Sequence, residues 1–296
     1  MKINMTNSLY YKNLSTVPKI KGVFVISHGM AEHMGRYDWL ISKLNSDGFH
    51  VISKDHRGHG NNIHQGNTPG LFSKKNGWIK VRDDLDDLVQ YVRNKYPELP
   101  CVLLAHSMGS WIALSLLNKK LNVDSIILSG SAKIPRTLIY LQLFIIKFEI
   151  MRNGYKAQSK FIDDMTIRKF NRDFAPNRTQ NDWISSDKKS VDNYTNDSLC
   201  GFIVTNSLWH DVCITMLNIF KKNYYLSSNF DIPILIITGK NDAANAKSKY
   251  ARALYLFLNK IFKCVQIIIL KNSRHEIFTD IEKDVAYDHC MKFVNK

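Results

Sequence analysis

Six short apolar runs, rich in β-branched residues, recur along the chain and predict buried β-strands. They are VFVIS (23–27), HVISKD (50–55), CVLLAHS (101–107), DSIILSG (124–130), PILIITG (233–239) and VQIIIL (265–270). Most are apolar throughout, which is typical of strands covered on both faces in a parallel sheet. Between them, apolar residues fall at helical spacing over 81–96 and 250–261. This alternation predicts a mostly parallel, doubly wound α/β sheet.

One long interval interrupts the alternation. About a hundred residues separate the strand that ends at Gly130 from the strand that begins at Pro233, and they contain no clear strand pattern. Because a structureless loop of that length is rare inside a compact domain, we expect a mainly helical cap inserted into the sheet domain. The predicted boundaries are 132–230 for the cap and 1–131 together with 231–296 for the core.

Part of the predicted cap is strongly apolar, and one face of a helix collects five of its large side chains. These are Leu138, Leu141, Phe144, Ile145 and Phe148, which fall at i, i+3, i+6, i+7 and i+10. Two interpretations of this face stay open. It packs the cap against the core, or it lines a channel for an apolar ligand, which would be an acyl chain in a lipid hydrolase, or touches a membrane.

Composition sets the class of protein and its expected location. An apolar fraction of 45% with 23% charged residues is globular. The five cysteines show no C-x-x-C spacing, so we interpret them as reduced thiols. The first 22 residues lack the apolar core of a secretory signal, and the run from Thr137 to Ile146 is about half of a membrane span. We therefore expect a cytoplasmic protein, in which peripheral contact with a membrane stays open.

The net charge of +15 raises the question of an anionic partner. Residues 133–229 hold 14 Lys/Arg and 9 Asp/Glu, which is close to the charge density of the whole chain. Because the charge is spread and no nucleic-acid motif accompanies it, no nucleic-acid partner is expected. A preference for anionic membrane surfaces remains open.

The stretch LLAHSMGSW (103–111) places Ser107 between a predicted strand and a predicted helix. Ligands of parallel sheets bind beyond the carboxyl ends of the strands, so a reactive residue is expected after a strand. The nucleophile-elbow pattern G-x-S-x-G needs small residues because strand and helix cross closely at a strained turn. Gly109 meets this need, whereas Ala105 adds one methyl group where the pattern has glycine. Ser107 is thus a candidate nucleophile that requires partners elsewhere.

Two later strand ends supply those partners. Asp242 follows PILIITG, and His275 follows VQIIIL. A serine needs a base, and the base needs an acid that orients it. The order Ser107, Asp242, His275 is that of an α/β-hydrolase. Asp231 precedes its strand and lies at the wrong end, while Asp280 is the alternative acid.

The other nine histidines are poorer candidates for the base. His106 adjoins the serine, and we expect its side chain to point away from it. His56, His59 and His64 form a loose group without the spacing of a known metal motif, and we interpret them as loop residues. No metal site is therefore expected.

An oxyanion needs two preorganised N–H donors. In α/β-hydrolases one donor follows the nucleophile, which predicts Met108, and the other lies in a loop after an early strand. VFVISHGM ends in such a loop, and His-Gly lets the backbone turn, so we predict Met30 as the second donor.

Five motifs occur in one order along the chain: HGMAEHMGRY (28–37), DHRGHG (55–60), AHSMGS (105–110), GKND (239–242) and RHE (274–276). Together they resemble the monoglyceride lipase and lysophospholipase branch of the α/β-hydrolases. The resemblance implies an α/β-hydrolase fold, a Ser107/Asp242/His275 triad, an oxyanion hole at Met30 and Met108, and a lipid-facing cap. We interpret DHRGHG as a structural loop.

These features predict hydrolysis of a lipid-like acyl ester, a monoacylglycerol or a lysophospholipid, through an acyl-enzyme without metal or cofactor. One alternative is a peptidase of the proline-iminopeptidase kind, which needs cap carboxylates such as Glu149, Asp163 or Asp164 to hold the substrate amine. A thioesterase is another. A non-catalytic basic protein that binds membranes or nucleic acid is more distant, because it has no need of a complete triad.

Overall fold

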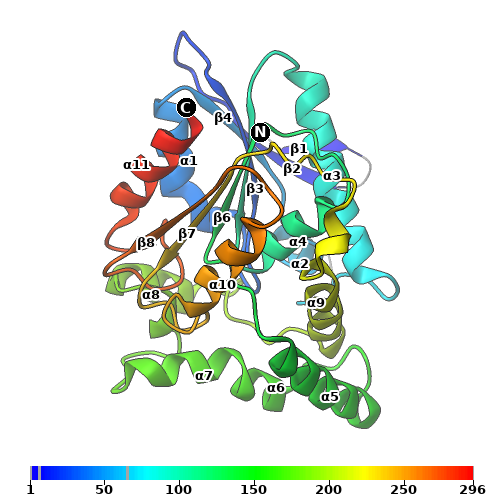
Figure 1. Ribbon diagram of the computed structural model, residues 1–296. Coiled ribbons are helices and arrows are strands. Elements are labelled where there is room, and N and C mark those ends of the chain that lie inside the picture. The colour runs from blue at the N-terminus through cyan, green and yellow to red at the C-terminus, as the bar shows by residue number, and fades with distance from the viewer. Residues whose placement is uncertain (1, 6–7, 65–66, 296) are drawn as a thin grey trace.

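The computed structural model describes residues 2–5, 8–64 and 67–295 (Figure 1). Its described residues form one eight-stranded sheet in the order β1-β2-β4-β3-β5-β6-β7-β8. The strands are β1 (Lys2–Met5), β2 (Ser8–Asn13), β3 (Gly22–Ser27), β4 (Phe49–Ser53), β5 (Cys101–His106), β6 (Ser125–Ser129), β7 (Ile234–Gly239) and β8 (Val265–Leu270). The pairs from β4 to β8 are parallel, whereas β1 and β2 are antiparallel.

All six predicted strands are present, as β3 to β8, and the prediction of a mostly parallel sheet is confirmed. The hairpin of β1 and β2 was not predicted. It forms the edge of the sheet, where β2 pairs with β4. An edge strand need not be apolar on both faces, so KINM and SLYYKN lack the apolar run that reveals the central strands.

Helices cover both faces of the sheet. On one face lie α1 (Asp38–Ser46) and α11 (Lys283–Val294), and on the other lie α3 (Gly77–Lys95), α4 (Met108–Leu116) and α10 (Lys249–Leu258). The alternation of side chains along β5 supplies both layers. Val102 and Leu104 pack with α1 and α11, while Leu103 and Ala105 pack with α3 and α4. The central strands are therefore apolar throughout.

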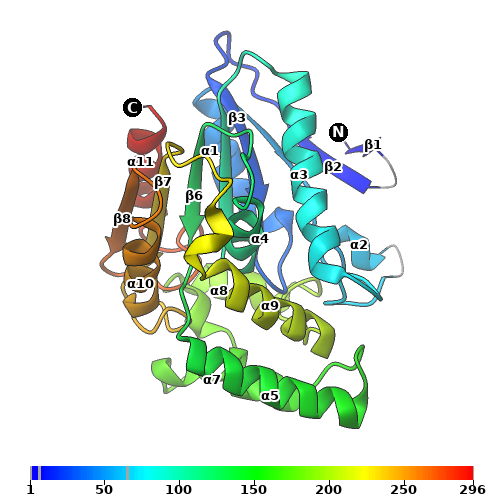
Figure 2. The same ribbon diagram turned by 45° about the vertical axis from the view of Figure 1, so that its right-hand side comes forward.

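The chain between β6 and β7 is helical and lies beyond the carboxyl ends of the strands (Figure 2). Among its described residues, β pairing is limited to the bridge between Gln158 and Thr205. Its helices are α5 (Arg136–Asn153), α6 (Lys160–Met165), α7 (Ile167–Asn171), η2 (Arg172–Phe174), η3 (Asp182–Ile184), α8 (Lys188–Asn196), α9 (Asn206–Ile219) and η4 (Lys222–Tyr225). Elsewhere, η1 (Met34–Tyr37) and α2 (Asn61–His64) are short.

Helix α5 packs on α9, which in turn packs on α3 and α4. The buried side of α5 consists of Ile139, Leu143, Ile146 and Glu149. The interpretation that the predicted apolar face packs the cap against the core is therefore wrong, because Phe144 is 72% exposed and Phe148 is 52% exposed. Helix α5 carries apolar side chains on all of its sides, so their spacing could not reveal which side is buried.

Among the described residues, no helix combines the length and the apolar character that crossing a membrane requires. The longest apolar segment, in α5, lies on the outside of the helical region between β6 and β7 (Figure 2). The cytoplasmic location expected from the sequence stays a prediction.

The two sides of α5 predict different costs of truncation. Replacing Ile146, which is 1% exposed, by alanine should lower the free energy of unfolding by about 2–5 kcal/mol, because it leaves a cavity against α9. Phe144→Ala on the exposed side should change it by no more than about 0.5 kcal/mol. Urea unfolding of both variants checks this, and equal costs would contradict the assignment of the two faces.

Candidate active site

Ser107 occupies a strained turn between β5 and α4. Its φ and ψ angles are 49° and −118°, and its N–H donates to the carbonyl of Ser129 at 2.9 Å. The helix crosses the neighbouring strand so closely that a Cβ on Gly109 would lie 2.3 Å from the carbonyl oxygen of Ser27. Ala105 is fully buried in the core, so its methyl group is accommodated on the strand side of the turn.

The carboxyl ends of β5, β7 and β8 bring three predicted residues together. Nε2 of His275 lies 2.9 Å from Oγ of Ser107, and Nδ1 of His275 lies 2.9 Å from Oδ2 of Asp242. Asp242 also accepts hydrogen bonds from the N–H of Ala244 at 2.9 Å and from the side-chain amide of Asn245 at 2.8 Å. The arrangement can pass the serine proton to an imidazole whose other nitrogen is held by a carboxylate.

The charges of this relay support each other. Burial raises the pKa of Asp242, but His275 and the hydrogen bonds of Asn245 outweigh it and hold the pKa below its usual value. Burial lowers the pKa of His275, and Asp242 more than offsets this, so the pKa lies above its usual value. The imidazole is thereby a stronger base than burial alone would allow.

The other two candidate acids have different roles. Asp280 is fully buried and accepts from the N–H groups of Arg274, Ser186 and Ile281, so it orders the loop that carries His275. Asp231 lies at the opposite end of β7 and forms an ion pair with Lys263.

Met30 and Met108, the two predicted oxyanion donors, both line the cavity above Ser107. Within the described part of the chain, neither N–H has a hydrogen-bond acceptor. Met108 is the first residue of α4, where N–H groups have no partner in the helix. Ala31, which follows Met30, has a φ of 53°, which is strained for any residue except glycine. The loop therefore holds an unusual conformation next to Ser107.

The helical region between β6 and β7 fixes that loop. The carbonyl of Ala31 accepts two hydrogen bonds, from the hydroxyl of Tyr194 at 3.0 Å and from the N–H of Gly201 at 2.9 Å. The guanidinium of Arg36, in η1, lies 5.2 Å from the centroid of the Tyr194 ring and helps to hold that ring in place. These contacts, which the sequence does not reveal, thus stabilise the strained conformation of Ala31.

A cavity of about 460 Å³ opens above Ser107 and is mainly apolar. Three of the predicted lining residues, Leu138, Leu141 and Ile145, lie in its wall. Phe144 and Phe148 do not, because they point to the exposed side of α5. Of the carboxylates considered for binding an amine, Asp163 lines the cavity but is paired with Arg168 at 2.9 Å, and Glu149 is buried elsewhere in a hydrogen bond with Ser159.

Buried ionisable groups behind the site were missed in the sequence. Glu276, next to His275, forms an ion pair with Arg36 at 2.6 Å. Glu32 accepts from the N–H of Gly29 and, at 3.0 Å, from the hydroxyl of Tyr37, while burial raises its pKa to about 8. Their positions inside the HGMAEHMGRY and RHE motifs were the available signal.

The expectation for His106 was wrong in one respect. Its side chain does not leave the site: the ring lies 4.9 Å from the ring of His275, and it lines the cavity. Burial lowers the pKa of His106 to about 3, so it contacts His275 as a neutral ring.

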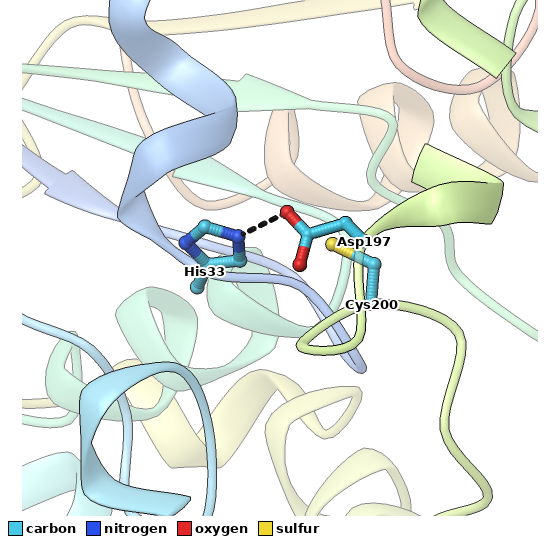
Figure 3. A group of neighbouring side chains, drawn as sticks. All are labelled: His33, Asp197 and Cys200. Carbon is cyan, nitrogen blue, oxygen red and sulfur yellow. Dashed lines mark hydrogen bonds and ion pairs between the residues drawn. The ribbon is translucent and has the colours of Figure 1, made fainter. Parts of the chain in front are cut away.

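Figure 3 shows a group that could hold a metal ion, made of His33, Asp197 and Cys200. Nδ1 of His33 accepts from the N–H of Gly35, so Nε2 carries the proton that it donates to Asp197 at 2.9 Å. Burial raises the pKa of the Cys200 thiol, which also disfavours the thiolate that a metal needs. These contacts fit a structural hydrogen bond that joins the start of η1 to the loop after α8 better than they fit a metal site.

Three further histidines, His28, His56 and His59, lie buried beneath the Met30 loop. The N–H of His56 donates to Nε2 of His28 at 2.9 Å, and their ring centroids are 4.2 Å apart. Burial lowers the pKa of His28 to about 4 and that of His59 to about 3. They support the loop as neutral rings, which agrees with a structural interpretation of DHRGHG.

With this geometry, comparison with known proteins identifies the family. A model described as serine aminopeptidase, S33 (Hydrolase_4) matches residues 18–282. The chain belongs to this family. It is also similar to a carboxyl esterase from Bacillus coagulans, whose structure superposes with a TM-score of 0.87 over 100% of this chain and 97% of that one, at 24% identity. The predicted α/β-hydrolase fold is thereby confirmed.

Sequence relatives point to one branch. The chain is 28% identical to the monoglyceride lipase of Rattus norvegicus over 75% of its length, and 36% identical to a monoglyceride lipase homolog of Monkeypox virus over 38%. The predicted resemblance to monoglyceride lipases is confirmed. The matches span 65% and 38% of those relatives' own lengths.

The buried histidines predict loss of stability in acid. Their unfolded pKa is about 6.5, so between that pH and the lower folded pKa only the unfolded chain binds the proton. Stability should be fully present above about pH 6.5 and fall below it by about 1.4 kcal/mol per pH unit for each histidine.

Urea unfolding between about pH 7 and pH 5 measures this slope, and His59→Gln should give a shallower one. Glu32, whose raised pKa acts in the opposite direction, is common to both proteins and cancels in the comparison. Parallel slopes would contradict the buried neutral state of His59.

Proposed function

We propose that the chain is a serine ester hydrolase that cleaves a lipid-like acyl ester, a monoacylglycerol or a lysophospholipid. The observation that carries the proposal is the Ser107–His275–Asp242 relay, with both distances at 2.9 Å, opening onto a mainly apolar cavity. The names of the similar proteins, which include monoglyceride lipases, agree with it.

The reaction runs through an acyl-enzyme. His275 takes the proton of Ser107 as its oxygen attacks the acyl carbonyl, and Asp242 holds the imidazole and stabilises its charge. The N–H groups of Met30 and Met108 stabilise the oxyanion. His275 then gives its proton to the leaving alcohol and later activates the water that releases the fatty acid.

Residues 132–230 act as the cap in this proposal, and 1–131 with 231–296 form the hydrolase core. Leu138, Leu141 and Ile145 lie in the cavity wall and would contact the acyl chain. Because each buried CH₂ is worth about 0.8 kcal/mol, turnover should depend on chain length until the cavity is filled.

The exposed side of α5 is suited to an anionic membrane surface. Tyr140, Phe144, Phe148 and Met151 are all more than half exposed there. Arg136 and Lys147 flank this stripe on one side and Arg152 on the other, while the helix's single acid, Glu149, is buried. Cations beside exposed apolar side chains are the pattern of an interfacial helix. Docking by this face would place the cavity near its lipid substrate.

The family description favours a second candidate, an aminopeptidase. Such an enzyme needs a carboxylate that can bind the substrate amine, and the pairing of Asp163 with Arg168 makes that cavity carboxylate a poorer partner. The mainly apolar cavity makes the lipid ester the preferred substrate class in this proposal.

Release of fatty acid from a monoacylglycerol and from a lysophospholipid of matched chain length tests the proposal. Ser107→Ala should lower kcat by on the order of a millionfold, because the nucleophile is lost. Preference for one lipid then identifies the head group. If neither lipid exceeds the Ser107→Ala blank, the ester proposal is wrong, and an amino-acid anilide and an acyl thioester test the peptidase and thioesterase alternatives.

Vesicle sedimentation tests the docking face. Binding to vesicles of phosphatidylglycerol and phosphatidylcholine should be weakened roughly tenfold or more by Phe144→Ser, because one aromatic side chain no longer enters the interface. Leu226→Ser, at a residue 75% exposed outside α5, is the matched control and should leave binding unchanged. Equal binding by both variants, or no loss in high salt, would contradict docking by α5.

A further inference from the structure

The imidazole of His275 contacts an aromatic ring from the helical region between β6 and β7. Trp183, in η3, lies with its ring centroid 5.0 Å from that of His275, and the two planes are inclined by 35°. Trp183 is 6% exposed and lines the cavity. The proposed base is thus covered by a residue that lies 92 positions earlier in the chain.

Hydrogen bonds to backbone carbonyls on both sides of Trp183 hold the two rings in place. The N–H of Glu276 donates to the carbonyl of Ile184 at 2.7 Å. The guanidinium of Arg274 donates to the carbonyls of Asp182 and Ser185. The residues that flank His275 are therefore bonded to residues that flank Trp183, and the ring contact does not depend on packing alone.

The contribution of Trp183 comes from its ring. In the described part of the chain its buried Nε1–H has no hydrogen-bond partner. The face of an indole attracts a cation more strongly than that of any other side chain, and it attracts a neutral imidazole far less. An interaction that strengthens as His275 becomes charged favours the transition state over the resting state.

Other groups that face His275 also bear on its charge. The carboxylates of Asp242 and Glu276 favour the charged ring, as Glu32 does when it is ionised, while burial opposes it. His106 contacts the ring and is held neutral. Asp242 acts at the Nδ1 edge, so an aromatic ring packed on the imidazole acts at a place that the carboxylate does not cover.

We propose that Trp183 is a positioning residue for His275, which keeps its imidazole aimed at Ser107 and stabilises the imidazolium that forms during the reaction. The inference rests on the proposed function for its kinetic part. It gives the segment between β6 and β7 a role in the chemistry as well as in substrate binding.

Three variants test the inference. Trp183→Leu removes the aromatic ring but keeps a smaller apolar side chain, Trp183→Phe keeps a weaker ring without the N–H, and Val191→Ala truncates the same small cluster at a residue 2% exposed away from the cavity. Melting temperatures establish that each variant is folded. For Trp183→Leu we expect kcat to fall about 3- to 30-fold with KM within about twofold. Trp183→Phe should lie between it and the parent chain, and Val191→Ala should retain the parent kcat.

The titration of His275, followed by NMR in the resting protein, gives a readout that a purely structural role would not move. Loss of the ring should lower the pKa of His275 in Trp183→Leu, and the acid limb of kcat/KM should shift to lower pH with it. An unchanged pKa and kcat, or a pKa that rises because water enters, would overturn the proposal.

The NMR result does not require turnover. If the parent chain shows no ester hydrolysis that depends on Ser107, the proposed function fails. The pKa comparison still decides whether Trp183 stabilises the charged ring.

Discussion

Two residues of the site, Ser107 and Ala31, hold positive φ angles without being glycine, and the rest of the site depends on the contacts that keep them there. Each such conformation costs on the order of 1–3 kcal/mol and persists only where its surroundings determine it. The sheet core holds Ser107, through the bond to Ser129 and the close crossing at Gly109. The helical region holds Ala31, through Tyr194 and Gly201. Ser107 and the loop of Met30 and Ala31 are therefore fixed by different parts of the chain.

Buried charge is the second constraint on the site. Asp242 and His275, and behind them Arg36 and Glu276, lie in pairs away from water. An unpaired buried charge is strongly destabilising, so each group here has a partner and further hydrogen bonds. In the proposed mechanism, the same exclusion of water would strengthen the interaction between Asp242 and the imidazolium as it forms. Burying these charged groups costs free energy, but in the proposed mechanism the same exclusion of water makes His275 an effective base.

The sequence predicted those features that follow from the parallel sheet. Apolar runs revealed β3 to β8, and residues placed just after strands had to meet at one edge, which brought Ser107, Asp242 and His275 together. It did not predict the β1–β2 hairpin, whose edge strands lack an apolar run, or the buried side of α5, whose residues are apolar all round. Trp183 and Tyr194 were out of reach because their contacts join segments whose relative placement no local pattern encodes.

This division has a consequence for how the segment between β6 and β7 can vary. Within its inner part, Asp182, Ile184, Ser185, Tyr194 and Gly201 are bonded to Ala31, Arg274 or Glu276, so substitutions that break these contacts act on the geometry around Ser107. The outer part, α5 to α7, contributes cavity wall and exposed surface, and α5 reaches the core through α9. In the proposed function, changes in the outer helices would alter which acyl chain or surface is bound, while the inner contacts keep Ser107, His275 and the Met30 loop in place. A fold with this separation can change what it binds without rebuilding the geometry around Ser107, which is why family membership alone does not identify a substrate.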